Sequence, residues 1–274
     1  MRLTLVAVAA ACLTLSGLPL AAQDVVETPK WKGQIEPVSG FTGQMSMTME
    51  GDVPADMAVE EVIRFEPWQM LDDLFRDDLV FLMRSGPTDW NTVDAPDAAV
   101  QDCASQRLVT EAGQDQMRQL GALLIVNGLK PGAITLSDWC RAQQTYLSLE
   151  EGMVGVDMNT LDGMNVGLDP TLRPLDAGDE TGAVEALRAR IMAWDGEEAG
   201  GPLLLITHFD NIETLTRFRV YEGEMLIVDP TRDGRVLGYV RLGSAVPDAV
   251  RFDPDVVAFA LRPGADTEGD AAGN

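Results

Sequence analysis

Two arginines and one histidine stand just after apolar stretches of the chain, where their side chains could bind an anion. Arg84 ends the apolar run at 79–83, and His208 follows the run at 203–207, while Arg141 comes soon after a third, shorter run. Such runs are typical of buried strands in a parallel sheet, and ligands bind at the carboxyl ends of these strands. The spacing therefore predicts an anion site in which guanidinium groups hold the oxygens of a phosphoryl group.

The elements that would position these residues alternate between strands and helices. Apolar runs and helical periodicity predict strands at 79–84, 133–136 and 203–207, and helices at 110–127, from about 140, at 180–194 and from about 212. Alternating apolar residues around Asp233-Gly234 predict a hairpin over 224–242. This order predicts an α/β fold, a three-layer α/β/α sandwich with a mainly parallel central sheet.

The remaining segments have weaker patterns. Residues 23–78 are expected to form an amino-terminal arm with a strand near 42–49 and a short helix at 67–77, ahead of a main domain at 79–261. Residues 152–178 lack a clear period and are expected to be an irregular insertion. The acidic tail, 262–274, has the composition of a disordered segment.

The charge balance limits the classes of partner. A formal net charge of −24 argues against binding to nucleic acid or to an anionic membrane surface. It also disfavours long-range capture of a phosphorylated substrate, so an anion site must rely on local arginines. The hydrophobic content of 46% is enough for a sizeable core.

The amino end has the layout of a secretory signal peptide. Arg2 precedes an apolar run that reaches Leu20, and small residues then favour cleavage near Ala22. The alternatives are a membrane anchor, for which the run is short, and a lipoprotein site at Cys12. The sequence thus predicts a periplasmic or secreted protein with no stable membrane insertion once 1–22 is removed.

Four segments together resemble the signature of the histidine phosphatase superfamily, which is phosphoglycerate-mutase-like. They are LMRSGPT at 82–88, RLVTEAG at 107–113, LSDWCRAQQT at 136–145 and LLITHFDNI at 204–212. The resemblance implies a histidine-phosphatase-like fold and a phosphate pocket formed by Arg84, Arg107, Arg141 and His208. It implies no cofactor and no metal. The alternative for each arginine is a surface ion pair, since the chain has 44 acidic residues.

One position departs from that signature. The family places its nucleophilic histidine directly after the first arginine, and this sequence has Ser85 there. A serine hydroxyl is a weak nucleophile without a neighbouring base, and His208 is the single histidine of the chain. The two-histidine mechanism of the family is therefore excluded by composition.

The sequence leaves the general acid open. Asp210, two residues after His208, is the first choice, although it is equally suited to cap a helix. The other candidate carboxylates are Asp162, Asp169, Glu150 and Glu151.

Two cysteines remain once the signal peptide is removed. The resemblance places Cys103 and Cys140 at the same rim of the pocket, and an even count in an oxidising compartment favours a disulfide. Two buried thiols or a metal pair are the alternatives, and a single histidine argues against the metal.

Three functions follow for comparison. The first is a secreted histidine-phosphatase-like protein that keeps a pocket for a phosphorylated or anionic small molecule but has impaired catalysis. The second is an active phosphomonoesterase that uses His208, Ser85 or an activated water. The third is a scaffold for protein contacts. The sequence does not name the ligand or the oligomeric state.

Overall fold

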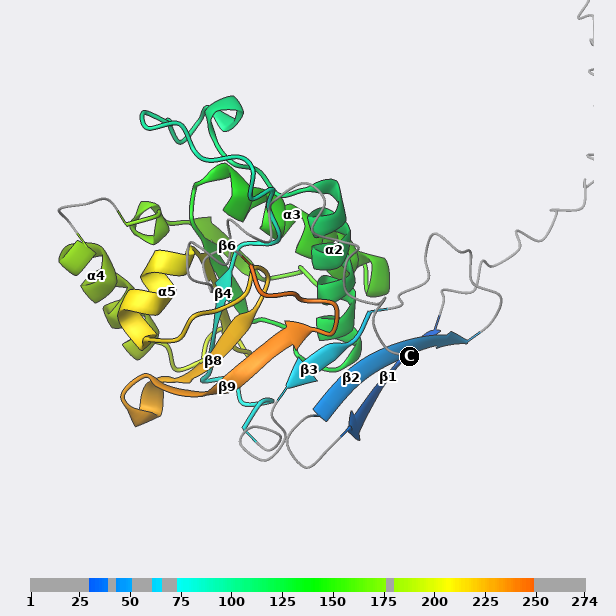
Figure 1. Ribbon diagram of the computed structural model, residues 1–274. Coiled ribbons are helices and arrows are strands. Elements are labelled where there is room, and N and C mark those ends of the chain that lie inside the picture. Colours follow the sequence, from blue (N-terminus) through cyan, green and yellow to red (C-terminus); the bar gives the residue numbers. More distant parts are fainter. Residues whose placement is uncertain (1–29, 39–42, 51–60, 66–72, 176–179, 249–274) are drawn as a thin grey trace, which may run out of the picture.

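The computed structural model describes residues 30–38, 43–50, 61–65, 73–175 and 180–248. Within these residues, one mixed β-sheet runs through the molecule in the strand order β1-β2-β3-β9-β8-β4-β7-β5-β6 (Figure 1). The strands are β1 Lys30–Pro37, β2 Gly43–Glu50, β3 Ile63–Phe65, β4 Val80–Arg84, β5 Ala133–Leu136, β6 Asn165–Leu168, β7 Leu203–Thr207, β8 Met225–Asp229 and β9 Arg235–Leu242.

Helices cover both faces of this sheet. One pair of helices, α2 Glu111–Val126 and α3 Cys140–Val156, lies on one face, and α4 Glu180–Met192 and α5 Phe209–Thr216 lie on the other (Figure 1). The side chains of β4 alternate between the two layers, with Phe81 and Met83 in one core cluster and Val80 and Leu82 in the other. The predicted α/β fold with three layers is confirmed.

Parallel pairing is confined to the part of the sheet that carries the predicted anion site. The parallel pairs are β4 with β7, β7 with β5, and β5 with β6. From β4 through β8, β9, β3 and β2 to β1, each neighbouring pair is antiparallel. The carboxyl ends of β4, β7 and β5 therefore lie side by side at the same end of the strands.

The start and end of α2 follow from local side-chain chemistry. Thr110 is the N-cap residue, and its hydroxyl accepts a hydrogen bond of 3.0 Å from the backbone N–H of Gly113. Glu111 adds a negative charge to the first turn, where the helix dipole favours it. The helix ends at Val126 with Asn127 as its C-cap residue, and Gly128 follows with a φ of +79°, which glycine adopts without strain.

Several weaker predictions are modified by the structure. The predicted strand near 42–49 is confirmed as β2, and β1, β2 and β3 extend the same sheet from the segment predicted to be an arm. The expectation of an irregular 152–178 is wrong in part, because this segment contains the end of α3 and the edge strand β6. Parallel pairing with β5 makes 165–168 a strand although three of its four side chains are exposed.

The predicted helix at 67–77 is not found where the chain is described. Its amino-terminal half lies outside the described residues, and residues 73–75 form a turn. The predicted signal peptide and the acidic tail also lie outside the described residues. Among the described residues, every helix is too short or too polar to cross a membrane.

Arg76, in the segment before β4, forms ion pairs with several carboxylates at the amino-terminal end of β4, opposite to the predicted site. Arg76 donates hydrogen bonds to Asp229 at 2.9 Å and to Asp78 at 2.8 Å, and it pairs with Asp73 at 3.2 Å. Burial, the largest single effect, raises the pKa of Asp229, but hydrogen bonds from Arg76 and Thr231 outweigh it and hold the pKa below its usual value. The interaction joins the segment before β4 to the end of β8.

Replacing Arg76 with methionine should lower the free energy of unfolding at pH 7 by about 3 kcal/mol, because the fully buried Asp229 would lose its main partner. Urea unfolding followed by circular dichroism measures the change. The stabilisation by the pair of Arg76 and Asp229 is fully present above the pKa of Asp229 in the unfolded chain, about 3.9. It is lost as the pH falls through the lower pKa of Asp229 in the folded chain. Arg188→Met removes an exposed pair with Glu185 and should change stability by less than about 0.5 kcal/mol. Equal unfolding midpoints for Arg76→Met and the wild type at pH 7 would contradict this assignment.

Candidate functional site

The carboxyl ends of the parallel strands bring the predicted cationic residues together. Arg84 is the last residue of β4, and His208 follows β7 as the N-cap residue of α5. Arg141 lies in the first turn of α3, just after β5. All three are buried, with 3% to 6% of each residue exposed. Arg107, in the loop before α2, is partly buried.

Electrostatic effects show that these groups share one environment. Burial is the largest cause that lowers the pKa of His208 well below its ordinary value, and the positive charges of Arg141, Arg84 and Arg107 lower it further. The imidazole is therefore neutral at pH 7. Its Nε2 lies 2.9 Å from the hydroxyl of Ser137, and its buried Nδ1 has no hydrogen-bond partner among the described residues.

Arg84 is held on all sides by groups from the carboxyl-terminal half of the chain. Its guanidinium pairs with Glu222 at 3.2 Å and with Asp248, and it donates to the backbone carbonyl of Val220 at 3.0 Å. It also lies over the ring of Phe209, 5.2 Å from the centroid. These contacts fix the guanidinium and neutralise its charge.

Arg141 has a carboxylate partner of its own. Its Nη1 lies 2.8 Å and 3.0 Å from the two carboxylate oxygens of Asp94. Burial is the largest effect on the pKa of Arg141 and lowers it, and the nearby positive charges of Arg107 and Arg84 add to that, whereas Asp94 acts in the opposite direction. Arg84 and Arg141 thus form buried ion pairs with carboxylates of the protein. The sequence analysis considered an anion site or a surface ion pair for them, but not a buried pair.

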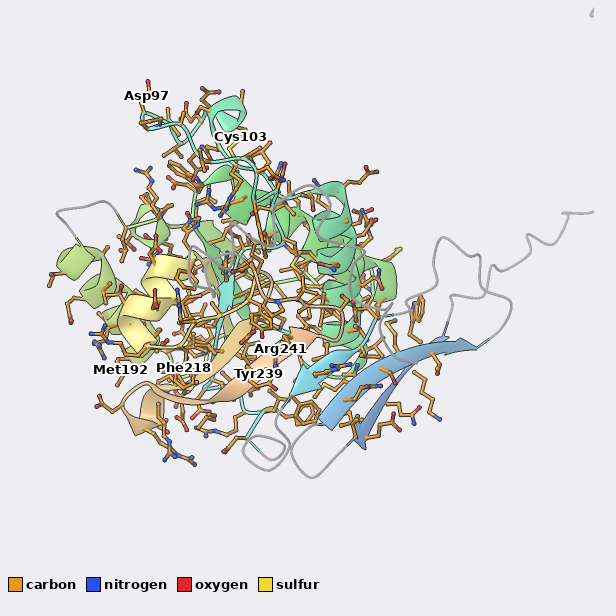
Figure 2. The ribbon with its side chains drawn as sticks, viewed as in Figure 1. Asp97, Cys103, Met192, Phe218, Tyr239 and Arg241 are labelled. Carbon is orange, nitrogen blue, oxygen red and sulfur yellow. A yellow bond between two sulfur atoms is a disulfide. The ribbon has the colours of Figure 1, made fainter. Side chains whose placement is uncertain are left out.

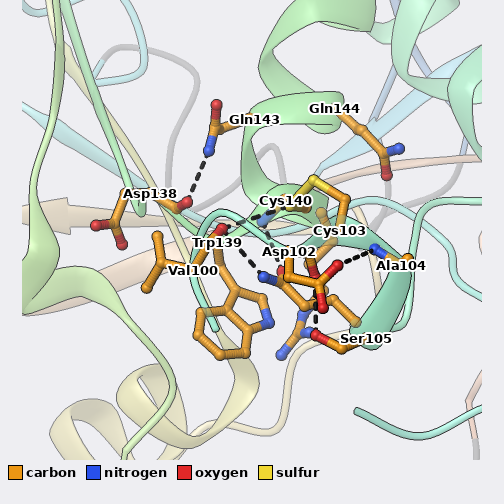
Figure 3. The surroundings of a disulfide bond; sticks show 12 residues. Val100, Asp102, Cys103, Ala104, Ser105, Asp138, Trp139, Cys140, Gln143 and Gln144 are labelled. Atoms are coloured by element: carbon orange, nitrogen blue, oxygen red, sulfur yellow. Dashed lines mark hydrogen bonds between the residues drawn. A yellow bond between two sulfur atoms is a disulfide. The ribbon is translucent and has the colours of Figure 1, made fainter. Parts of the chain in front are cut away.

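The loop that carries Asp94 is tied to the start of α3. Figure 2 shows Asp97 and Cys103 on this loop, which extends beyond the helices. Cys103 and Cys140 form a disulfide, as predicted (Figure 3). The side chain of Gln106 accepts a hydrogen bond of 2.9 Å from the backbone N–H of Cys140. Asp94 also accepts a bond of 2.6 Å from the backbone N–H of Arg107. These links hold the Asp94 carboxylate against Arg141.

Ser85 directly follows β4. Its backbone N–H donates to Thr207 and its carbonyl accepts from Gly223, at 3.1 Å and 3.0 Å. Within the described part of the chain, its hydroxyl has no hydrogen-bond partner, so no base is positioned to take its proton. The serine is 3% exposed.

The carboxylates considered for a general acid lie in different surroundings. Asp210 is exposed on the first turn of α5, and since His208 is the N-cap residue, Asp210 is not the helix cap. Asp169 pairs with Arg190 and caps a short helical turn, and Glu151 pairs with Arg118. Asp162 is exposed in a turn and Glu150 is partly buried on α3.

Sequence reasoning missed the acidic members of the site, which are Glu222, Asp94 and Asp248. They lie in three loops that are distant in the sequence and have no motif. A general signal existed, because a buried arginine in a chain with 44 acidic residues needs a carboxylate partner. That signal predicts that a partner exists but does not say which residue it is.

Comparison with known proteins finds similarity to solved structures at low sequence identity. No protein-family model matches the sequence, and no curated protein matches it. The protein histidine phosphatase SixA in complex with tungstate is 19% identical, with a TM-score of 0.38, over 58% of this chain and 93% of that one. Mycobacterial glucosyl-3-phosphoglycerate phosphatase with VO3 is 18% identical, with a TM-score of 0.36, over 55% and 92%. Phosphoglycerate mutase from Plasmodium falciparum is 16% identical, with a TM-score of 0.35, over 62% and 89%.

The buried imidazole generates a test that needs no assignment, because His208 is the single histidine of the sequence. Its NMR signals should remain those of a neutral ring from pH 8 down to about 6, whereas an exposed histidine titrates near 6.5. Since the unfolded chain takes up a proton near pH 6.5 and the folded chain does not, stability should fall as the pH drops below about 6.5.

The variant Arg141→Met should raise the pKa of His208, because one of the three nearby positive charges is removed. Arg188→Met, on the exposed face of α4, should leave it unchanged. A titration midpoint at or above about 6.5 in the wild-type protein would contradict a buried imidazole among guanidinium groups.

Proposed function

We propose that this chain is a histidine-phosphatase-like protein that binds an anionic small molecule at its arginine cluster and has lost phosphohistidine chemistry. The cluster consists of Arg84, Arg107 and Arg141, with His208 beside them. The observation that carries the proposal is the environment of Ser85, which occupies the nucleophile position with a hydroxyl that has no base among the described residues.

The chemistry of the imidazole supports this proposal. His208 directs its Nε2 to Ser137 rather than to Ser85. A neutral ring with one engaged nitrogen can donate or accept a hydrogen bond toward a bound oxyanion, but it is not placed to activate the serine. Even a phosphorylated Ser85 would be a stable monoester whose release needs further catalysis.

The ion pairs of the cluster determine how an anion could bind. Asp94 already neutralises Arg141, and Glu222 and Asp248 neutralise Arg84. An external phosphoryl group must therefore exchange with these carboxylates, and binding to the wild-type protein should be weak. The same observation favours a second candidate function, a scaffold in which the arginines only tie loops to the sheet.

We also propose that the protein is exported to the periplasm or secreted. The layout of 1–22 and the disulfide between Cys103 and Cys140 both suit an oxidising compartment. The amino terminus of the protein isolated from its own cells should begin near Gln23. An intact Met1 or a retained Arg2 would contradict cleavage.

Two measurements on the wild-type protein separate the candidate functions. The rate of hydrolysis of an aryl phosphate should equal the enzyme-free rate, and calorimetry should detect weak binding of inorganic phosphate that Arg141→Met abolishes. Hydrolysis would instead indicate an active phosphomonoesterase. If the protein neither binds phosphate nor hydrolyses the aryl phosphate, the result would indicate the scaffold.

Removing the carboxylate that competes at Arg141 should strengthen binding of phosphate. Asp94→Asn keeps an oxygen that can accept the bond from the backbone of Arg107, but it removes the negative charge. The affinity measured by calorimetry should rise at least about tenfold. Asp97→Asn, an exposed residue of the same loop, is the matched control and should have no effect. Equal effects of the two variants would show a general charge effect and not competition at Arg141.

Restoring an imidazole at the nucleophile position tests the loss of catalysis. Ser85→His should raise hydrolysis of the aryl phosphate at least about tenfold above the wild type, because it supplies a nucleophile beside the guanidinium groups. Ser85→Ala is the control and should show no gain. No gain with Ser85→His would mean that the pocket has changed beyond its nucleophile.

A further inference from the structure

The carboxylate of Glu222 is surrounded by hydrogen-bond donors of four different kinds. It accepts from the backbone N–H of Thr88 at 3.0 Å, from the hydroxyl of the same residue at 2.5 Å, and from the indole N–H of Trp90 at 3.4 Å. The guanidinium of Arg84 lies 3.2 Å away, and that of Arg107 lies 4.0 Å away. Convergence of neutral and charged donors on two oxygens is the arrangement by which proteins bind oxyanions.

Two of these donors, Thr88 and Arg84, are fixed by contacts that do not involve Glu222. Thr88 forms a β-bridge with Val109, and the preceding carbonyl of Pro87 accepts a bond of 2.9 Å from the N–H of Thr110. Arg84 is held separately by Asp248, by the carbonyl of Val220 and by the ring of Phe209. The positions of these two donors should therefore persist when the side chain of Glu222 is removed.

The position of Glu222 also gives solvent a route to these donors. It lies in the turn before β8, next to Gly223, whose φ of +75° turns the chain there. It lines a cavity of about 500 Å³ together with Thr88, Trp90 and Asp248. Shortening the Glu222 side chain would connect this cavity with the donors that the carboxylate now occupies.

From this geometry we infer that Thr88, Trp90 and Arg84 form an oxyanion subsite whose resident occupant is the protein's own Glu222 carboxylate. The subsite takes up a small external carboxylate or a phosphate when that side chain is removed. The inference deepens the proposed function and rests on it, because the subsite shares Arg84 with the proposed anion site. It adds Thr88 and Trp90 as binding residues. It does not include Arg141 and His208, which contact Asp94 and Ser137 instead.

The test is chemical rescue of Glu222→Ala by small oxyanions. Thermal unfolding is measured in sodium formate, in sodium phosphate and in sodium chloride at matched ionic strength and pH 7. Formate replaces the missing carboxylate, so it should raise the melting temperature of the variant by about 5 °C over chloride at a concentration about fifty times its dissociation constant. Phosphate should act in the same direction. The formate response of the wild-type protein should be smaller than that of the variant, because Glu222 occupies the subsite.

Glu224→Ala is the matched control. It also removes a buried carboxylate from this turn, but the ion pair of Glu224 is with Arg241 at 3.5 Å. Its melting temperature should be the same in formate and in chloride. Adding Thr88→Val to Glu222→Ala removes the hydroxyl donor and should reduce the rescue.

Each result decides the inference. A response of Glu222→Ala to formate no larger than its response to chloride, or an equal response of Glu224→Ala, would overturn it. If Glu222→Ala is unfolded in chloride, recovery of its circular dichroism spectrum in formate supports the subsite, and failure to recover in both oxyanions overturns it. The proposed function fails separately, through hydrolysis by the wild type or phosphate binding that is insensitive to Arg141→Met.

Discussion

Buried guanidinium groups at the carboxyl edge of the sheet are the constraint on which the rest of the structure depends. Arg84 and Arg141 are 4% and 6% exposed, and a buried charge without a partner costs several kcal/mol. Asp248 and Glu222 compensate Arg84, and Asp94 compensates Arg141. The three loops that carry these carboxylates must therefore close over the ends of the strands. Ion pairing therefore adds to the apolar contacts that Val220 and Ala245 of these loops make with the core.

The strands and the cationic residues could be predicted because their signals are local. Five buried residues in a row define each of β4 and β7, and a residue that directly follows a strand must lie at its carboxyl end. Arg84 and His208 therefore reach one edge whatever the loops do. The signal for the start of α2 is equally local, since the hydroxyl of Thr110 accepts a hydrogen bond from the backbone N–H of Gly113 within one turn.

The partners of these residues could not be predicted because their signals are not local. Glu222 meets Thr88 across 134 positions of the chain, and no periodicity links the two. The edge strand β6 owes its conformation to pairing with β5, and its exposed side chains carry little strand pattern. The alternative considered for the arginines was a surface ion pair, whereas the ion pairs of Arg84 and Arg141 are buried because the loops cover them.

The charge balance of the site agrees with the proposed loss of turnover, in addition to Ser85 at the nucleophile position. A phosphoryl group brought to Arg84 or Arg141 would displace a carboxylate that remains close by, and like charges a few ångströms apart repel strongly in a buried site. The neutral His208 adds no positive charge to offset this repulsion. Transition states of phosphoryl transfer are stabilised by cationic groups that are fixed where negative charge develops and are not already neutralised by a carboxylate. A cluster whose arginines are already paired with carboxylates supplies less of this stabilisation, which agrees with the proposal that the site holds an anion by exchange.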